Sequence, residues 1–313
     1  MKNVIYLGPV DALPVARNIL EPLWKVVAAE TTSDGVAARL SSAVAILDAS
    51  MKVRFDRAML DRATKLRVVS TATTGADHID AKALADRKIP LLTLQGEKEL
   101  LWNLTPAAEL SWTLLMACAR RLRGAVRHVL EGNWVRENFP GIMLKGKTLG
   151  LIGCGRIGSW MALYARAFDM DVLGYDPFVD PWPAQIRRAD LHTLLSQADF
   201  ISVHVMLSDS TRGLIGAREF KLMKPGVIFI NTSRGDLTDE RALLQSLMDG
   251  RIGAAGVDVL QGEPAINDHP LVKYAQTHDN LIITPHIGGF SPDAVKTVVA
   301  HAAQRIASVL AGR

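Results

Sequence analysis

The stretch KGKTLGLIGCGRIG, residues 145–158, decides the fold class of this chain. An apolar segment typical of a buried strand leads into Gly153, Gly155 and Gly158, and a helical pattern follows. Glycines at this spacing permit a tight turn, close approach of the backbone to a diphosphate and close packing of helix on strand. The stretch predicts a nucleotide-binding unit with phosphate at the helix N-terminus, although a structural glycine turn would look similar when taken alone.

The strand that should come next strengthens this prediction. Its sequence, DVLGYD, ends on Asp176, which lies 18 residues after Gly158, where a carboxylate can reach the hydroxyls of an adenosine ribose. A carboxylate there would repel a 2′-phosphate, and Pro177 and Phe178 follow it rather than a basic residue. We therefore expect NAD as cofactor, with NADH preferred over NADPH. A methyltransferase could use a similar loop and carboxylate.

The pattern along the chain predicts an α/β fold with parallel sheets. In the first part, strands are expected at 4–7, 25–28, 43–47, 67–71 and 90–94, and helices at 12–23, 35–40, 55–63 and 81–87. A long connecting helix is expected at 106–131. A second series should follow, with six strands at 148–152, 172–175, 200–205, 227–231, 254–260 and 281–284. The last helix, 292–310, carries an apolar stripe and must therefore pack on another element.

Composition and charge indicate which kinds of partner this chain can bind. The 313 residues suffice for two domains, and the net charge of +4 comes from basic residues scattered among acidic ones, which argues against a nucleic-acid partner. The two cysteines, Cys118 and Cys154, have no metal-ligand or disulfide spacing, so we expect no metal and a reducing compartment. No apolar run reaches ~18 residues. We expect a cytoplasmic protein that binds a small molecule and no membrane.

Each of three late strands is followed by a polar residue beyond its carboxyl end. GVIFIN leads to Arg234, AAGVDVL to Glu263, and LIITP to His286. Each has an ordinary structural explanation when taken singly: an ion pair, a solvated loop carboxylate or a structural histidine. Ligands of parallel sheets bind beyond the carboxyl ends of strands, so the three together, on a sheet that also carries the glycine loop, favour a functional site.

The three residue types suit transfer of a hydride between an alcohol and a nicotinamide. A histidine titrates near neutral pH and can take up or supply the alcohol proton. A carboxylate on its other ring nitrogen would fix the tautomer, and an arginine can hold a substrate carboxylate through two parallel hydrogen bonds. We therefore expect His286 and Glu263 to form an acid/base pair and Arg234 to bind the substrate.

Specific motifs resemble those of the D-isomer-specific 2-hydroxyacid dehydrogenases, a family that includes D-3-phosphoglycerate dehydrogenases. The similar stretches are KGKTLGLIGCGRIG (145–158), GYDP (174–177), INTSRGDLTDE (230–240), GAAGVDVLQGEP (253–264) and TPHIGG (284–289). The resemblance implies an NAD-dependent oxidoreductase that interconverts a small 2-oxo acid and the D-2-hydroxy acid. It places Arg234, Glu263 and His286 in catalysis, and Thr74 and Gly75, in STATTGADHID (70–80), at the substrate carboxylate. The residues that it implies at the cofactor, besides the three glycines and Asp176, are Arg156, Ile157, Val205, Thr232 and Asp258.

The same resemblance implies two domains of the parallel-sheet Rossmann and flavodoxin-like type with a cleft between them. Residues 1–102 and 288–313 would form the substrate-binding domain, and residues 103–287 the NAD-binding domain. Family members usually form homodimers through the cofactor domain, with the loop around Trp134 embracing the partner.

Two departures from the family pattern restrict the substrate. Phosphoglycerate dehydrogenases carry basic residues near the start of the substrate loop, where this chain has Ser70, Thr71 and Ala72, and it has Asp48 and Ala49 near the preceding strand end. We therefore do not expect 3-phosphoglycerate as substrate. The alternative to an enzyme is a catalytically weak NAD(H)-sensing interaction protein of the corepressor type, because such proteins share this fold and its catalytic-looking residues.

Overall fold

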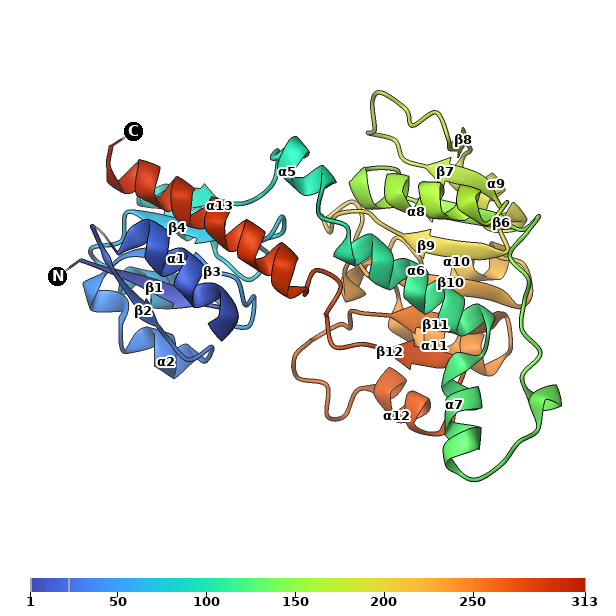
Figure 1. The fold of residues 1–313 in the computed structure, drawn as a ribbon. Coiled ribbons are helices and arrows are strands. Elements are labelled where there is room, and N and C mark those ends of the chain that lie inside the picture. The colour runs from blue at the N-terminus through green and yellow to red at the C-terminus, as the bar shows by residue number, and fades with distance from the viewer. Residues whose placement is uncertain (1, 22, 313) are drawn as a thin grey trace. The chain divides into compact units, whose positions relative to one another are not determined.

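The chain divides into two compact units, one of them discontinuous in sequence. A computed structural model describes residues 2–21 and 23–312; residues 1, 22 and 313, all within the expected first domain, and residue 22 also within the expected helix 12–23, lie outside the described residues. Unit 1 comprises residues 1–104 and 290–313, and unit 2 comprises residues 105–289 (Figure 1). Both units have the predicted α/β fold.

Unit 1 is built on a five-stranded parallel sheet with the strand order β2-β1-β3-β4-β5, which is the flavodoxin-like order. The strands are β1 (Asn3–Leu7), β2 (Lys25–Ala28), β3 (Ala43–Asp48), β4 (Val68–Thr71) and β5 (Leu91–Leu92). Every residue of β3 and β4 is buried. Helices on both faces cause this burial, so residues 43–47 of β3 form a continuous apolar run rather than an alternating one.

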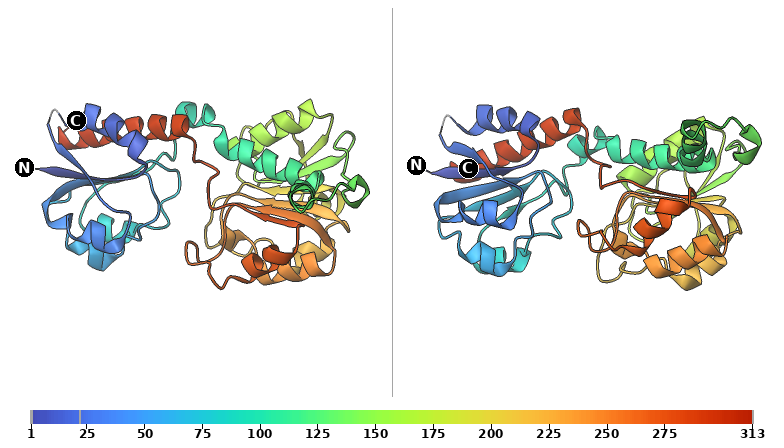
Figure 2. Two further views of the ribbon diagram at one scale, coloured as in Figure 1. Left: turned by 60° about the horizontal axis from the view of Figure 1, so that its bottom comes forward. Right: turned by 90° about the horizontal axis from the view of Figure 1, so that it is seen from below.

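Helices cover both faces of the sheet of unit 1. On one face, α1 (Leu13–Leu20) and α13 (Pro292–Leu310) lie side by side in all views (Figures 1 and 2). The other face is covered by α2 (Ser33–Ala37), α3 (Arg57–Asp61) and α4 (Ala81–Asp86). The apolar stripe of α13, which includes Val299 and Ile306, is buried against the sheet, so the last helix completes the first core. One further helix, α5 (Lys98–Trp102), was not predicted.

Unit 2 contains a seven-stranded parallel sheet with the order β12-β11-β10-β9-β6-β7-β8. The strands are β6 (Thr148–Ile152), β7 (Asp171–Tyr175), β8 (Arg187–Arg188), β9 (Phe200–Val203), β10 (Val227–Asn231), β11 (Ile252–Val257) and β12 (Leu281–Ile283). The order reverses between β6 and β9, as in dinucleotide-binding sheets. The prediction of six strands was wrong by one, because the short edge strand β8 consists of two arginines and carries no apolar pattern.

The helices of unit 2 again form two layers. One face of the sheet packs against α6 (Pro106–Ala119) and α8 (Arg156–Ala167). The other packs against α9 (Leu191–Gln197), α10 (Ala217–Leu222), α11 (Glu240–Met248) and α12 (Pro270–Thr277). The single helix predicted at 106–131 was wrong. Arg121 adopts a left-handed φ of 48°, so α6 ends at Ala119 and α7 (Leu122–Leu130) begins as a separate helix.

Short 3₁₀ turns complete the secondary structure, at Val10–Ala12, Leu40–Ser42, Arg136–Asn138 and Gly235–Leu237. In residues 2–21 and 23–312, no helix combines the length and the apolar character that crossing a membrane requires.

Candidate active site

The glycine loop lies between β6 and α8, at the point where the strand order reverses. Gly153 has a φ of +96°, and a Cβ atom there would lie 2.5 Å from the carbonyl oxygen of His204. A Cβ atom on Gly158 would lie 2.2 Å from the carbonyl oxygen of Gly153. Both glycines are therefore required by the packing of the loop itself.

Gly155 differs from these two glycines. A Cβ atom on Gly155 would have no other atom within 4 Å, so the space beside this residue is open. Gly155 is also the N-cap of α8 and offers no side chain to the first N–H groups of the helix. An open approach to a helix N-terminus fits a diphosphate, because the N–H groups and the helix dipole both favour an anion.

Asp176 directly follows β7 and links two loops. Its Oδ2 accepts a hydrogen bond from the N–H of Cys154 at 2.9 Å, and its Oδ1 accepts from Phe178 N at 2.9 Å and Val179 N at 3.1 Å. A carboxylate can accept about four hydrogen bonds, so capacity remains for a ribose hydroxyl. Asp176 also lines an open pocket with Tyr175, Pro177, Arg187, Arg188, Ala189, Asp190 and Thr193.

Arg187 and Arg188 are pocket residues that the sequence analysis missed. They form β8, which pairs with β7 and so brings both side chains beside Asp176. The guanidinium carbon of Arg188 lies 4.7 Å from the ring centre of Trp182, a cation–π contact. The only signal in the sequence was the pair of adjacent basic residues.

Arg234 is placed by a buried asparagine at the end of β10. Asn231, which is 2% exposed, donates from Nδ2 to the carbonyl oxygen of Arg234 at 2.9 Å and to Thr238 Oγ1 at 3.2 Å. Its Oδ1 accepts from the N–H of Ser233 at 3.0 Å. These bonds fix the turn after the strand, and Arg234 lies half-buried at the carboxyl edge of the sheet with Nη1 donating to Ser233 O at 2.8 Å.

The side chains of Glu263 and His286 lie in contact with each other. His286 Nδ1 lies 2.5 Å from Glu263 Oε1, and the two side chains are 33% and 31% exposed. The other oxygen of Glu263 accepts from Leu260 N at 3.2 Å. Because Glu263 engages Nδ1, Nε2 is the ring nitrogen that a substrate can meet. A carboxylate in this position fixes the tautomer and the orientation of the imidazole ring.

Asp258 organises the turn that carries His286. The backbone of His286 is left-handed, with a φ of 55°, and its N–H donates to the carbonyl oxygen of Asp258 at 2.9 Å. The carboxylate of Asp258 is buried and accepts from Thr284 Oγ1 at 2.5 Å, Ile287 N at 2.9 Å and Gly288 N at 2.7 Å. Burial raises the pKa of Asp258, and these bonds oppose that rise. Its location beside a nicotinamide carboxamide stays a prediction.

A second buried pair supports the segment that carries Glu263. Glu240 is 9% exposed; its Oε1 accepts from Gln261 N at 2.9 Å and its Oε2 lies 2.8 Å from His269 Nε2. Burial raises the pKa of Glu240. The sequence analysis missed this pair, because Glu240 begins a helix and His269 caps another, and neither position signals the contact between them.

The other predicted residues lie in both units. Arg156 and Ile157 form the first turn of α8, and burial lowers the pKa of Arg156. Val205 follows β9 and is half-buried, and the hydroxyl of Thr232 lies 2.7 Å from that of Ser111 in α6. Thr74 and Gly75 belong to unit 1, in the loop after β4.

His204 is a second histidine at the same edge of the sheet, directly after β9. Its Nε2 lies 2.8 Å from Ser202 Oγ, and burial lowers the pKa of His204 to about 3. The ring is therefore neutral at ordinary pH, and its described contacts include no carboxylate. His286 is the better candidate for proton transfer.

Comparisons with known proteins agree with this geometry. The family model described as D-isomer specific 2-hydroxyacid dehydrogenase, NAD binding domain, matches residues 112–288. A D-3-phosphoglycerate dehydrogenase of Methanocaldococcus jannaschii is 37% identical over 95% of this chain and 56% of its own length. A hydroxypyruvate reductase of Thermotoga maritima is 36% identical over 82% of this chain and 80% of its own. The crystal structure of the TT0316 protein from Thermus thermophilus has a TM-score of 0.87 at 32% identity, over 99% of this chain and 97% of that one.

This chain and the phosphoglycerate dehydrogenases that it matches differ in length. The chain spans about half the length of the phosphoglycerate dehydrogenases that it matches, 56% of the one from Methanocaldococcus jannaschii and 48% of one from Archaeoglobus fulgidus.

Substitutions at two glycines distinguish an effect on stability from an effect on cofactor binding. We expect Gly155→Ala to leave the free energy of unfolding within about 0.5 kcal/mol of the wild type, because its Cβ meets no atom. The methyl group would occupy the approach of the diphosphate, so the Kd for NADH should rise about tenfold or more. Urea unfolding and NADH fluorescence titration measure the two effects.

Gly158→Ala is the matched variant. Its Cβ would clash with the backbone of Gly153, so the free energy of unfolding should fall by at least about 2 kcal/mol. Equal effects of both substitutions on stability would contradict the distinction between an open and a packed glycine.

The low pKa of His204 predicts that stability depends on pH. The pKa of a histidine in an unfolded chain is near 6.5, and the pKa of His204 in the folded protein is about 3. Between these two values the unfolded chain binds a proton on this histidine and the native state does not. The contribution is complete above about pH 6.5 and declines as the pH falls toward 3, by up to ~1.4 kcal/mol per unit. Between about pH 7 and pH 5, urea unfolding should show that the wild type loses about 2 kcal/mol more than His204→Asn. Equal losses would argue against burial of this ring.

Proposed function

This chain belongs to the D-isomer specific 2-hydroxyacid dehydrogenases, and we propose on that basis that it is an NAD-dependent oxidoreductase interconverting a small 2-oxo acid and the D-2-hydroxy acid. The observation that carries the proposal is the contact between Glu263 and His286, at the same edge of the sheet as the glycine loop. The pair can exchange a proton with a carbonyl or hydroxyl oxygen beside a bound nucleotide.

The glycine loop and its neighbours fit a dinucleotide. The open space at Gly155 and the first N–H groups of α8 would hold the diphosphate, and Asp176 has capacity for a ribose hydroxyl. When bound, NADH supplies the hydride that reduces the carbonyl carbon of the 2-oxo acid. Asp176 would repel a 2′-phosphate, which supports a preference for NADH over NADPH. Arg187 and Arg188 line the same pocket, and their positive charges alone would favour a 2′-phosphate. The preference for NADH therefore depends on the carboxylate of Asp176.

The acid/base pair acts in both directions. In reduction, protonated His286 donates the proton of Nε2 to the substrate oxygen as the alcohol forms. In oxidation, neutral His286 accepts that proton. Glu263 fixes the tautomer of His286 through Nδ1 and keeps the orientation of its ring, a role that the distance of 2.5 Å supports.

The substrate carboxylate requires donors that match its shape and charge. Arg234 can hold it through two parallel hydrogen bonds, a geometry that lysine does not reproduce. The N–H groups of Thr74 and Gly75 are further donors that the family resemblance suggests for the same carboxylate. They make no hydrogen bond within residues 2–21 and 23–312, so they are available to an anion.

The first unit supports a substrate with an uncharged side chain. Ser70, Thr71 and Ala72 are buried where a phosphate-binding member would carry basic residues, and the nearby strand end carries the buried carboxylate of Asp48. A second anionic group on the substrate would find no basic side chain at these positions. We propose short 2-oxo acids without phosphate as substrates.

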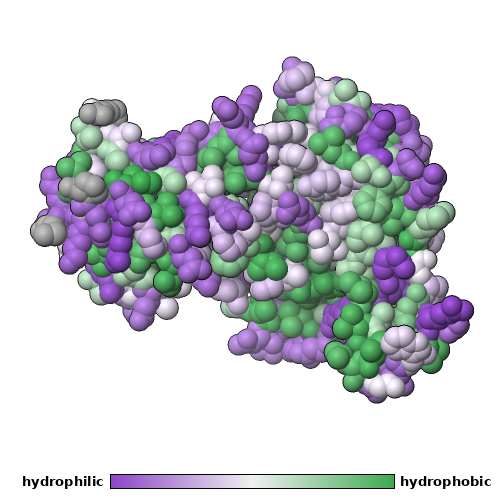
Figure 3. All heavy atoms as spheres, in the orientation of Figure 1, coloured by the Kyte–Doolittle hydropathy of each residue, from purple (hydrophilic) through white to green (hydrophobic). Residues whose placement is uncertain are grey.

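An exposed apolar surface on unit 2 supports assembly with a second copy of the chain. We call the α7 surface the exposed hydrophobic side chains of α7 and the segment after it: Leu122, Val126, Val129, Leu130, Trp134, Val135 and Met143. Leu130 and Trp134 are 83% and 87% exposed. Figure 3 shows hydrophobic side chains at the surface over α7. Grouped side chains of this kind mark interfaces, and we propose a homodimer through this surface.

The function is tested by NADH oxidation with a panel of 2-oxo acids: glyoxylate, hydroxypyruvate, pyruvate, longer branched or aromatic acids, and phosphohydroxypyruvate. We expect turnover of one or more acids without phosphate. His286→Ala should lower kcat by roughly 10²- to 10⁴-fold, the usual contribution of a general acid or base, with the Kd for NADH changed less than about twofold.

Arg234→Lys should raise KM for the acid, because the two parallel hydrogen bonds are lost.

The control is His192→Ala, which removes an exposed histidine of α9. It should retain full activity. NADH binding without turnover of any acid, or full activity of His286→Ala, would reject the enzymatic proposal and favour the NAD(H)-sensing alternative of the corepressor type.

The homodimer is tested by light scattering after size-exclusion chromatography. We expect a wild-type mass of twice the 34.0 kDa of one chain. Leu130→Asp and Trp134→Asp should each shift the mass toward one chain, because a charge would be buried in the interface. Val10→Asp changes a residue that is 80% exposed in unit 1 and should leave the mass unchanged. A monomeric wild type would refute the proposal.

A further inference from the structure

Asp48 is a fully buried carboxylate in unit 1 that the proposed reaction does not use. It ends β3, and the strand order of the sheet reverses between β1 and β3. The side chain is 0% exposed. A carboxylate in such a place is costly unless several donors surround it, so its hydrogen bonds indicate what it holds in place.

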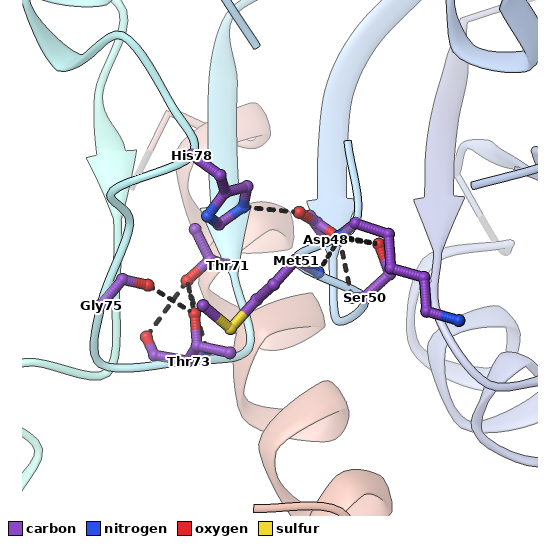
Figure 4. A network of polar contacts seen from close by, with 8 residues as sticks. Asp48, Ser50, Met51, Thr71, Thr73, Gly75 and His78 are labelled. Carbon is purple, nitrogen blue, oxygen red and sulfur yellow. Dashed lines mark hydrogen bonds and ion pairs between the residues drawn. The ribbon is translucent and has the colours of Figure 1, made fainter. Parts of the chain in front are cut away.

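The donors come from two different loops. From the loop after β3, Oδ1 accepts from Ser50 N and Ser50 Oγ, both at 2.8 Å, and from Met51 N at 3.3 Å. From the loop after β4, His78 Nε2 lies 2.8 Å from Oδ2, and Figure 4 shows the two side chains directed toward each other. The carbonyl oxygen of Asp48 also accepts from Ala72 N at 2.8 Å. Asp48 therefore joins the loop after β3 to the loop after β4.

His78 depends on this contact for its position. Its side chain is 11% exposed, and Nδ1 is buried without a hydrogen-bond partner in the described part of the chain. The tautomer with its proton on Nε2 donates to Asp48 and leaves no buried N–H unsatisfied. Asp48 is thus the polar group that orients the imidazole. The imidazole and the hydrogen bond from Phe55 N to the carbonyl oxygen of His78, at 2.8 Å, together anchor the end of the loop after β4.

The part of the loop between Thr71 and His78 is held by its own hydroxyl groups and by Leu94, whose N–H donates to the carbonyl oxygen of Thr73 at 2.9 Å. The hydroxyls of Thr71 and Thr73 lie 2.6 Å apart, and Thr73 Oγ1 donates to the carbonyl oxygen of Gly75 at 2.7 Å (Figure 4). These bonds use carbonyl and hydroxyl oxygens. The N–H groups of Thr74 and Gly75 make no hydrogen bond within the described residues, so the loop presents two adjacent amide donors, an arrangement that suits an anion.

We propose that Asp48 and His78 are positioning residues, a buried pair that holds the loop so that the amides of Thr74 and Gly75 can bind the carboxylate of the substrate. The inference rests on the proposed function, because that function supplies the anionic ligand. The pair does not touch the reacting atoms. It determines KM for the acid rather than the chemical step, since displacement of the loop by ~1 Å weakens binding through both amides.

Met51 extends the same arrangement. Its φ is 56°, a left-handed value unusual for a side chain of this size, and its N–H donates to Asp48. In Figure 4 the side chain of Met51 extends to the side of the network where Thr73 is drawn. Asp48 thus also holds the backbone of the loop after β3 at this residue.

The test compares two substitutions of His78 in the full chain. His78→Leu removes the contact with Asp48, whereas the amide nitrogen of His78→Gln can replace Nε2 as donor. We expect His78→Leu to raise KM for the 2-oxo acid about tenfold or more with kcat within about threefold, and His78→Gln to restore KM to within about threefold of the wild type. The Kd for NADH should not change in either variant.

A matched control removes another histidine–carboxylate contact from unit 1. His301 in α13 lies 3.4 Å from Glu97 and is remote in sequence from both loops. His301→Leu should leave KM unchanged. An unchanged KM in folded His78→Leu, or an equal rise in His301→Leu, would overturn the proposal. Circular dichroism monitors folding, and His78→Asn, whose amide is shorter, replaces His78→Leu if the latter does not fold.

A second measurement keeps the inference separate from the proposed function. Titration of the isotope-labelled protein with oxamate, an unreactive 2-oxo acid analogue, should shift the amide resonances of Thr74 and Gly75 in the wild type and in His78→Gln, but not in His78→Leu. This result needs no turnover, so it would support the inference even in an inactive protein. Turnover without these amide shifts would confirm the enzyme and reject the positioning pair.

Discussion

Parallel pairing of the strands is the constraint on which the rest of the structure depends. Each strand pairing in both sheets is parallel. Parallel neighbours need a crossover between them, so all carboxyl ends of a sheet lie at one edge, together with the loops that follow them. Residues as distant in sequence as Gly153 and His286 therefore lie at one edge of unit 2. The chemistry of that edge depends on which side chain follows each strand.

Carboxylates of low exposure hold these loops in place. Asp48 and Asp258 each accept hydrogen bonds from backbone N–H groups of the loop that follows a strand, and Glu240 does the same for the segment before Glu263. Their burial would be unfavourable without those donors, so the carboxylates and the loop conformations depend on each other. The side chains of Glu263 and His286 can consequently remain about one-third exposed while their backbones are fixed.

Much of the fold and part of the site could be predicted from the sequence. Continuous apolar runs such as residues 227–230 mark strands that are buried on both faces, and glycines that admit no Cβ, such as Gly153, mark the nucleotide loop. The contact between Glu263 and His286 followed from their positions after neighbouring strands. Other features had no local signal. The break at Arg121 occurs at a residue type that does not favour a left-handed backbone, and β8 is too short and too polar to recognise.

The pairs Asp48–His78 and Glu240–His269 show why the rest of the site could not be predicted. Their partners are 30 and 29 residues apart in sequence, and they meet only because the sheets have formed. A histidine beside a carboxylate has no characteristic spacing across two loops. Sequence patterns identify which residues follow a strand, whereas tertiary structure decides which of them share a hydrogen bond.

The packing of α13 on the first sheet has a consequence for synthesis of the chain on the ribosome. Val299 and Ile306 belong to the same core as Val4 and Ala45, so this core cannot close until the last helix has been made. Unit 2, residues 105–289, is complete before that point. At ~5–20 residues per second, the first hundred residues would wait roughly 10–40 s with this sheet face covered only in part, by α1. The nascent chain therefore needs protection of its N-terminal strands, while the nucleotide-binding half can already fold.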